Sequence, residues 1–158
     1  QKGDRENFRK HAGEALRLRP DLGELHNNMG SAHVNDENAP LASATFRQAA
    51  DRSPLSQPIR DNLMRVLLVE GRYDEAAVQA RIVFEANPDD PVNLHNLATA
   101  LRSANMTEVA VRTFRGALRV NPKFAESLKA MDLVNEEEKN GRLPKDAGSV
   151  WESPTGGP

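Results

Sequence analysis

Asparagine recurs at one fixed interval in this chain, at Asn28, Asn62 and Asn96. A primary amide both donates and accepts hydrogen bonds, so it can pair with a peptide main chain of any sequence. If the three residues stand on stacked helices, their backbones lie about 8–10 Å apart. An extended peptide advances about 3.3 Å per residue, so each amide would meet it at about every third residue. At ~0.5–1.5 kcal/mol net per hydrogen bond, the row predicts modest affinity for a main chain.

Other polar side chains fall close to these asparagines in the sequence and are candidates for reading a ligand's side chains. They are Asp61, Arg65, His95, Thr99 and Arg102. The two arginines favour an acidic or polar peptide over a basic one, because a guanidinium pairs with carboxylates through parallel hydrogen bonds. For both arginines, an ordinary solvated surface position is the alternative interpretation.

The sequence contains no pattern typical of a catalytic or metal site. His26 and His33 are too far apart in the sequence to form a histidine pair on one helical turn, and we expect them to pack. No nucleophile–base pair or glycine-rich phosphate loop is present. The chain has no cysteine, which excludes disulfides, thiol nucleophiles and cysteine metal ligands. We therefore predict a protein that is not an enzyme and that needs no cofactor or metal.

Composition excludes two further classes of partner. The formal net charge of −2 argues against general nucleic-acid binding, which needs clustered cations. No apolar run approaches the length of a membrane span, which takes about 18 residues or more. The sequence opens at Gln1 rather than Met, so a targeting signal upstream is left open. The localisation is thus unknown, with the cytoplasm favoured.

The elements that would position the asparagines follow the same period. Prolines at positions 20, 54, 88 and 122 share the interval, and each lies between two predicted helical segments. Alanine recurs with it at Ala42, Ala76 and Ala110. A period of about 34 residues with helix–turn–helix content is typical of one repeat family. From about residue 3 to 140, the chain resembles the tetratricopeptide repeat (TPR) family.

The resemblance implies an all-α fold, a right-handed α–α superhelix of three full repeats with flanking half-repeats. In the implied division, 1–22 is a partial repeat with only its second helix, and 142–158 is a Pro/Gly-rich tail without regular structure. The remaining segments are three repeats at 23–56, 57–90 and 91–124 and a C-terminal capping helix at 125–141. First helices should begin near Gln57 and Pro91, and second helices near Asn38 and Thr107.

The two ends of the predicted array differ. In the last helix, Asp132 and Asn135 stand where earlier first helices carry mainly apolar residues, which is typical of a capping helix with a polar outer face. The amphipathic helix at 4–18 lacks the first helix of its own repeat, so its apolar face is expected to need another partner. Self-association through this helix, or through the tail around Trp151, is therefore possible.

The resemblance places first helices on a concave surface, and with it the candidate residues. It implies a non-catalytic interaction scaffold or adaptor that binds an extended peptide or partner segment there. Asparagine in this register also commonly bonds between neighbouring helices in the family, which is the competing interpretation of the row. The row is similar to the asparagine ladder of protein O-linked N-acetylglucosamine transferases, so a substrate-recognition arm of a larger enzyme is one alternative. A self-assembling scaffold is another. The carboxylate clamp of chaperone-binding relatives is absent, since Asn27 and Val92 stand where it needs lysines.

Overall fold

The computed structural model describes the backbone of residues 2–141 and the side chains of residues 6–137 and 139–141. Over this range every regular element is a helix, which confirms the predicted all-α class. The helices are α1 (Lys2–Leu18), α2 (Gly23–Asn35), α3 (Ala39–Arg52), α4 (Gln57–Val69), α5 (Tyr73–Ala86), α6 (Pro91–Ser103), α7 (Thr107–Val120) and α8 (Ala125–Lys139). The predicted tail at 142–158, including Trp151, lies outside the described residues.

Local sequence explains where the helices begin. Asn38 caps α3 by accepting a hydrogen bond from the Leu41 amide at 3.2 Å, and a proline follows in the first turn. Asp90 caps α6 in the same way through the Val92 amide at 2.8 Å. These bonds satisfy amides that a helix start otherwise leaves unpaired. Helix α7 begins at Thr107, where its start was predicted, although its N-cap Met106 makes no side-chain capping bond.

The turns between first and second helices repeat one backbone conformation. Glu37, Gly71 and Asn105 have φ values of 58°, 71° and 60°, in the left-handed region. They are separated by the same interval as the asparagines, so the same turn occurs in each repeat. Glycine and asparagine are the residues that adopt this conformation most readily. Glu37 is therefore the unfavourable member of the series.

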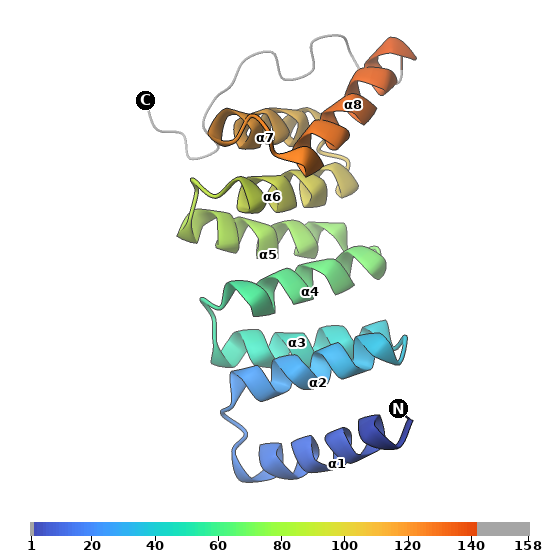
Figure 1. Ribbon diagram of the computed structural model, residues 1–158, viewed down its shortest axis with the longest axis vertical. Coiled ribbons are helices and arrows are strands. Elements are labelled where there is room, and N and C mark those ends of the chain that lie inside the picture. The colour runs from blue at the N-terminus through green and yellow to red at the C-terminus, as the bar shows by residue number, and fades with distance from the viewer. Residues whose placement is uncertain (1, 142–158) are drawn as a thin grey trace. The chain divides into compact units, whose positions relative to one another are not determined.

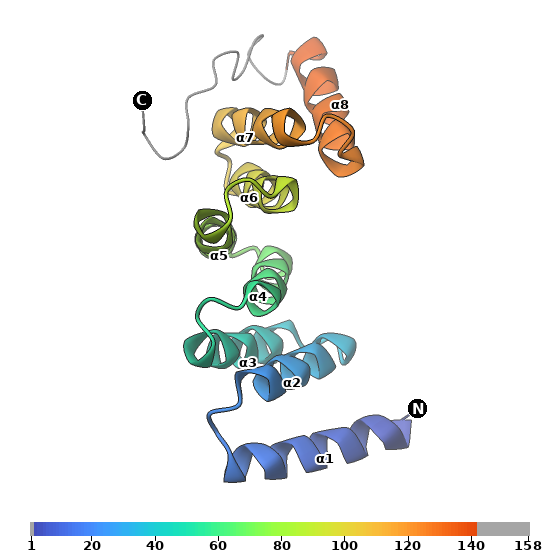
Figure 2. The ribbon, with the colours of Figure 1, turned by 60° about the vertical axis from the view of Figure 1, so that its left-hand side comes forward.

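The chain divides into two compact units, residues 1–79 and 80–158, with the boundary inside α5. In unit 1, α2 and α3 lie side by side as a hairpin, and α4 packs on both of them (Figures 1 and 2). Phe46, Leu63 and Leu67 form much of its core, each at most 2% exposed. In unit 2, α6 and α7 form the equivalent hairpin and α8 packs on α7, around Phe114 and Val134.

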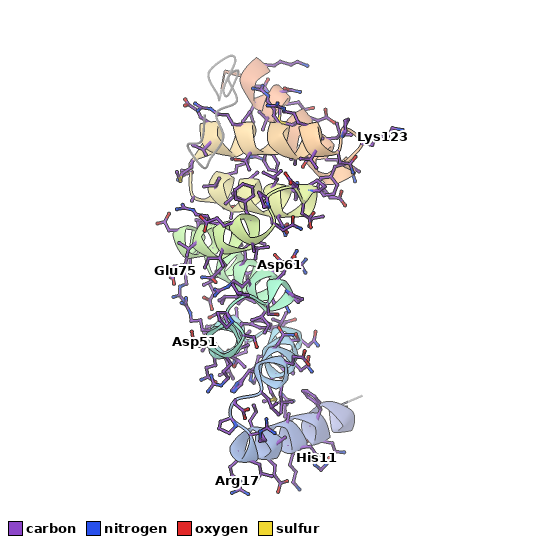
Figure 3. All side chains as sticks on the ribbon, turned by 90° about the vertical axis from the view of Figure 1, so that its left-hand side faces the viewer. His11, Arg17, Asp51, Asp61, Glu75 and Lys123 are labelled. Atoms are coloured by element: carbon purple, nitrogen blue, oxygen red, sulfur yellow. The ribbon has the colours of Figure 1, made fainter. Side chains whose placement is uncertain are left out.

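Within unit 1, the first and second helices present different sides. Asp61 of α4 projects from one side, whereas Asp51 of α3 and Glu75 lie on the other (Figure 3). On that second side, Arg47 and Arg72 both bond Glu75, at 2.6 Å each, and their hydrogen bonds lower the pKa of its carboxyl. This network joins the second helices α3 and α5.

Helix α1 is the least buried helix of unit 1. Of its described side chains only Ala12 is buried, and Phe8 remains 39% exposed. Ala12 and the half-buried Leu16 belong to the face that was expected to lack an in-chain partner. That expectation is wrong over part of the face, because α1 contacts α2 and Arg9 forms an ion pair with Asp36.

Candidate functional site

A solvent-open hollow of about 480 Å³ lies between α2 and α4 in unit 1. We call it the α2/α4 hollow. It is lined by Ser31, Val34, Asn35, Glu37, Ala39, Phe46, Asn62, Arg65, Val66 and Val69. The buried side chains of Phe46 and Val66 give it an apolar floor, and Val34 and Val69 are exposed at 45% and 79%. Its volume falls in the range of about 300–1,000 Å³ that is typical of ligand sites.

Gly30 makes the position of this floor possible. A β-carbon built on Gly30 would lie 2.7 Å from Cδ1 and Cε1 of the Phe46 ring, well inside van der Waals contact. The ring therefore lies directly against the backbone of α2. Glycine costs about 1 kcal/mol relative to alanine within a helix, so this close approach has a local energetic cost.

The asparagine row is partly engaged within the protein. Asn62 Nδ2 donates to Asn27 Oδ1 at 3.0 Å, a bond between α4 and α2, and Asn62 also lines the α2/α4 hollow. Asn28 lines a second hollow of about 270 Å³, next to Phe8 of α1. Asn96 is half-buried on α6 in unit 2. The helix-to-helix bond that competes with ligand binding is thus present at Asn62, while part of its amide remains at the hollow.

The two charged candidates on α4 differ in burial. Arg65 is exposed, lines the hollow and has no ion-pair or hydrogen-bond partner for its side chain among the described residues. Asp61, one turn earlier, is half-buried. Arg65 is therefore the candidate cation in unit 1 that a ligand carboxylate could reach.

In unit 2, His95 packs within the protein, which differs from its predicted projection into a groove. Its Nδ1 lies 3.0 Å from the Ser127 hydroxyl, and its ring centroid is 5.4 Å from that of Phe114 and 5.6 Å from that of Phe124. Burial lowers the pKa of His95, with a smaller opposing effect from Glu126. Helix α8 contributes to this burial, because Ser127 lies on α8 and Phe124 immediately before it.

The other two candidates of unit 2 also have partners. Thr99 Oγ1 donates to the main-chain oxygen of His95 at 2.9 Å, within its own helix. Arg102 forms an ion pair with Glu137 of α8 at 2.6 Å. The structure therefore brings Asn62 and Arg65 to one hollow, whereas His95, Thr99 and Arg102 bond within unit 2.

Comparison with solved structures finds this helical arrangement in proteins of low sequence identity. YrrB, described as a TPR protein with an unusual peptide-binding site, is 23% identical, with a TM-score of 0.71 over 83% of this chain and 68% of that one. MamA is 14% identical, with a TM-score of 0.76 over 94% and 85%. The TPR domain of Arabidopsis OM64 is 16% identical, with a TM-score of 0.65 over 73% and 96%. The chain has the TPR fold.

No protein-family profile matches the TPR-fold chain, and no curated protein does. Its assignment therefore depends on the repeat period and on the structural likeness. At these identities the likeness establishes the fold and leaves the ligand open.

Some residues that line the hollow were missed by the sequence interpretation. Glu37, Phe46 and Val69 line the hollow but were not predicted as site residues. Glu37 could have been found, because it aligns with Gly71 and Asn105 in the inter-helix turn. Phe46 carried no such signal, because its register repeats as Ala80 and Phe114, which is typical of core. Val69 is a single exposed apolar residue whose register is otherwise polar.

The TPR-fold chain shows neither a metal cluster nor a membrane-spanning helix among its described residues. Among the side chains of residues 6–137 and 139–141, no three acidic or histidine groups come together in a way that could hold a metal ion. Within the same part of the chain, no helix has the length and apolar character needed to cross a membrane.

Proposed function

We propose that this chain is a non-catalytic protein–protein interaction scaffold that holds an extended peptide segment against its first helices. The observation that carries the proposal is the α2/α4 hollow, where apolar walls, the Asn62 amide and the unpaired Arg65 guanidinium meet in one solvent-open site among the described residues. Apolar walls with a few polar groups are typical of ligand-binding clefts. The described peptide-binding site of YrrB agrees with a peptide ligand on this fold.

In this proposal the residues have two roles. Asn28, Asn62 and Asn96 would bond the peptide main chain. Asp61 and Arg65 would set the side-chain preference, and Arg65 is best placed because it has no internal partner among the described residues. His95, Thr99 and Arg102 bond within unit 2, so we do not place them in contact with the ligand. We expect a Kd of about 1–100 μM, or about −5.5 to −8 kcal/mol. An adaptor of this kind gains strength through avidity.

The test is selection from a random peptide library, followed by binding assays on two variants that break the same internal bond. Asn62→Ala removes the amide at the hollow, and Asn27→Ala removes only its helix-to-helix partner. If Asn62 bonds the ligand, Asn62→Ala weakens binding several-fold and Asn27→Ala does not. Equal losses would assign Asn62 a structural role, and no binding by the parent would contradict the proposed function.

A self-assembling scaffold is the second candidate, favoured by the 39% exposure of Phe8 on α1. Light scattering over a concentration series distinguishes it. A mass that rises with concentration in the parent but not in Phe8→Ser would favour assembly, whereas a constant monomer mass would exclude it.

A further inference from the structure

The α2/α4 hollow has a counterpart in unit 2, two repeat periods later in the sequence. Phe46 corresponds to Phe114 and Val66 to Val134, so the apolar floor is kept, with each residue at most 5% exposed. The rim differs. Val34 and Val69 correspond to Arg102 and Glu137, the two partners of the ion pair in unit 2.

The ion pair satisfies the counterpart site internally. Arg102 Nη2 lies 2.6 Å from Glu137 Oε1, and the two side chains are 30% and 29% exposed. A charged pair at this distance joins α6 to α8 at the position where unit 1 has two exposed valines. The same scaffold position is thus bridged in unit 2 and unbridged in unit 1.

The charges that remain around the α2/α4 hollow have no internal partners in the part of the chain that the structure describes. Neither Arg65 nor Glu37 has a hydrogen bond or an ion pair for its side chain there. The position of Arg65 in unit 1 corresponds to Leu133 in unit 2, two repeats later. Glu37 stands in the inter-helix turn although its φ of 58° is unfavourable for a glutamate. Strained backbone of this kind is frequent at functional sites.

We propose that the α2/α4 hollow is the selectivity pocket of the scaffold and that it takes one bulky aliphatic side chain from an extended partner segment. An acidic residue on one side of that anchor would pair with Arg65, and a basic residue on the other side would pair with Glu37. This inference rests on the proposed function and names its ligand class. Charge complementarity with the two unpaired groups selects this partner, because the apolar floor alone would accept any bulky side chain. A guanidinium can bind a carboxylate through two parallel hydrogen bonds, which gives the acidic position the stronger preference.

Two variants test the pocket directly. The double variant Val34→Arg/Val69→Glu introduces the ion pair of unit 2 at the corresponding positions of unit 1. The repeat already accommodates this pair in unit 2. Arg65→Glu reverses the charge of an exposed side chain and leaves the core unchanged. The matched control is Arg102→Val/Glu137→Val, which opens the counterpart site in unit 2.

The experiment is phage selection of random dodecapeptides on the full chain, followed by anisotropy measurements with the most enriched peptide. We expect enriched peptides to carry an aliphatic residue between an acidic and a basic one. Val34→Arg/Val69→Glu should weaken binding at least about tenfold, which corresponds to about 1.4 kcal/mol. Selection on Arg65→Glu should replace the acidic residue by a basic one, and the unit 2 control should bind within about twofold of the parent.

Failure of this inference is distinguishable from failure of the proposed function. If the parent binds its enriched peptide and Val34→Arg/Val69→Glu binds it equally well, the hollow is not the pocket although the scaffold binds peptides. If Arg65→Glu selects the same acidic peptides, the charge assignment is wrong. If peptides are selected only after residues 145–158 are deleted, the occupant is the chain's own tail, which overturns an external partner. If no form of the chain selects peptides, the proposed function fails as well.

Discussion

The first-helix faces of the two units have the same architecture and opposite character. In unit 1, α2 and α4 border an open apolar hollow, and the arginine at its edge is unpaired among the described residues. In unit 2, Arg102 of α6 pairs with Glu137 of α8, and His95 packs against Phe114 and Phe124. The periodic core of the repeat is kept in both. Two rim positions therefore separate an open surface in unit 1 from one that is bridged by its own side chains in unit 2.

The contrast shows how the surface of a repeat can change at low structural cost. Residues such as Phe46 and Phe114 must keep their size because the stacked helices close around them. The rim residues face solvent, so they change without loss of the fold. An exposed or half-exposed ion pair contributes only ~0–1 kcal/mol, so its gain or loss changes the surface more than the stability.

The largest predicted effect on stability comes from a substitution at the floor of the α2/α4 hollow. Gly30→Ala would place a β-carbon 2.7 Å from the Phe46 ring, so the buried ring must move. Overpacking costs about 1–3 kcal/mol, against a helix-propensity gain of at most about 1 kcal/mol. We expect a net loss of up to about 2 kcal/mol in the free energy of unfolding, measured by urea denaturation, with weaker peptide binding.

Gly13→Ala is the matched control for this glycine. Gly13 is exposed on α1, and nothing lies within 4 Å of a β-carbon built there. This variant should gain up to about 1 kcal/mol. Equal gains at both positions would show that Phe46 does not need the glycine.

The N-caps of corresponding first helices give the next contrast. Asp90 bonds the first turn of α6 in unit 2, whereas Ser56 at the start of α4 in unit 1 makes no side-chain capping bond. Asp90→Ala should therefore cost about 1 kcal/mol in the free energy of unfolding, and Ser56→Ala a few tenths. Circular dichroism during denaturation measures both. A larger loss for Ser56→Ala would contradict this difference between the units.

Much of the fold followed from the sequence, and less of the site did. The repeat period placed the helices, and residues such as Asn38 and Pro91 predicted where they start, because capping signals act over one turn of local chain. Arg65 and Asn62 were also predicted as surface residues and do line the hollow. The partners of His95 and Arg102 were not predictable, since they come from α8, beyond the next helix in the chain. Which polar side chains remain unpaired is a tertiary property, so register alone could not separate Arg65 from Arg102.

The strained turn gives a smaller effect of opposite sign. Asn105 adopts the left-handed conformation in unit 2 at the position that Glu37 holds in unit 1. Glu37→Asn should raise the free energy of unfolding by about 0.5 kcal/mol, because asparagine tolerates this conformation better. Thermal unfolding measures the change, and Asn105→Glu should give a loss of similar size. If Glu37→Asn destabilises the chain, the turn in unit 1 needs the glutamate for another reason.

The pH dependence of unit 2 gives the smallest effect, since water partly screens the half-buried His95. Burial lowers its pKa below the usual value of 6.5. The unfolded state thus binds more protons than the folded state as the pH falls through about 6.5, so folding stability falls with it. The contribution of His95 is fully present above that pH. His95→Gln should reduce the loss of Tm between mildly alkaline and mildly acidic buffer, and an unchanged loss would show that His95 is not responsible.

The most direct measurement is an NMR titration of the assigned, ¹⁵N-labelled chain with the peptide that the library selects. We predict the main amide shifts at Ser31, Val34, Asn62, Arg65 and Val69, around the α2/α4 hollow, and only small shifts at Arg102 and Glu137. Shifts concentrated on α6 and α8 in unit 2, or on the second helices, would contradict the assignment of the ligand to the open first-helix face of unit 1.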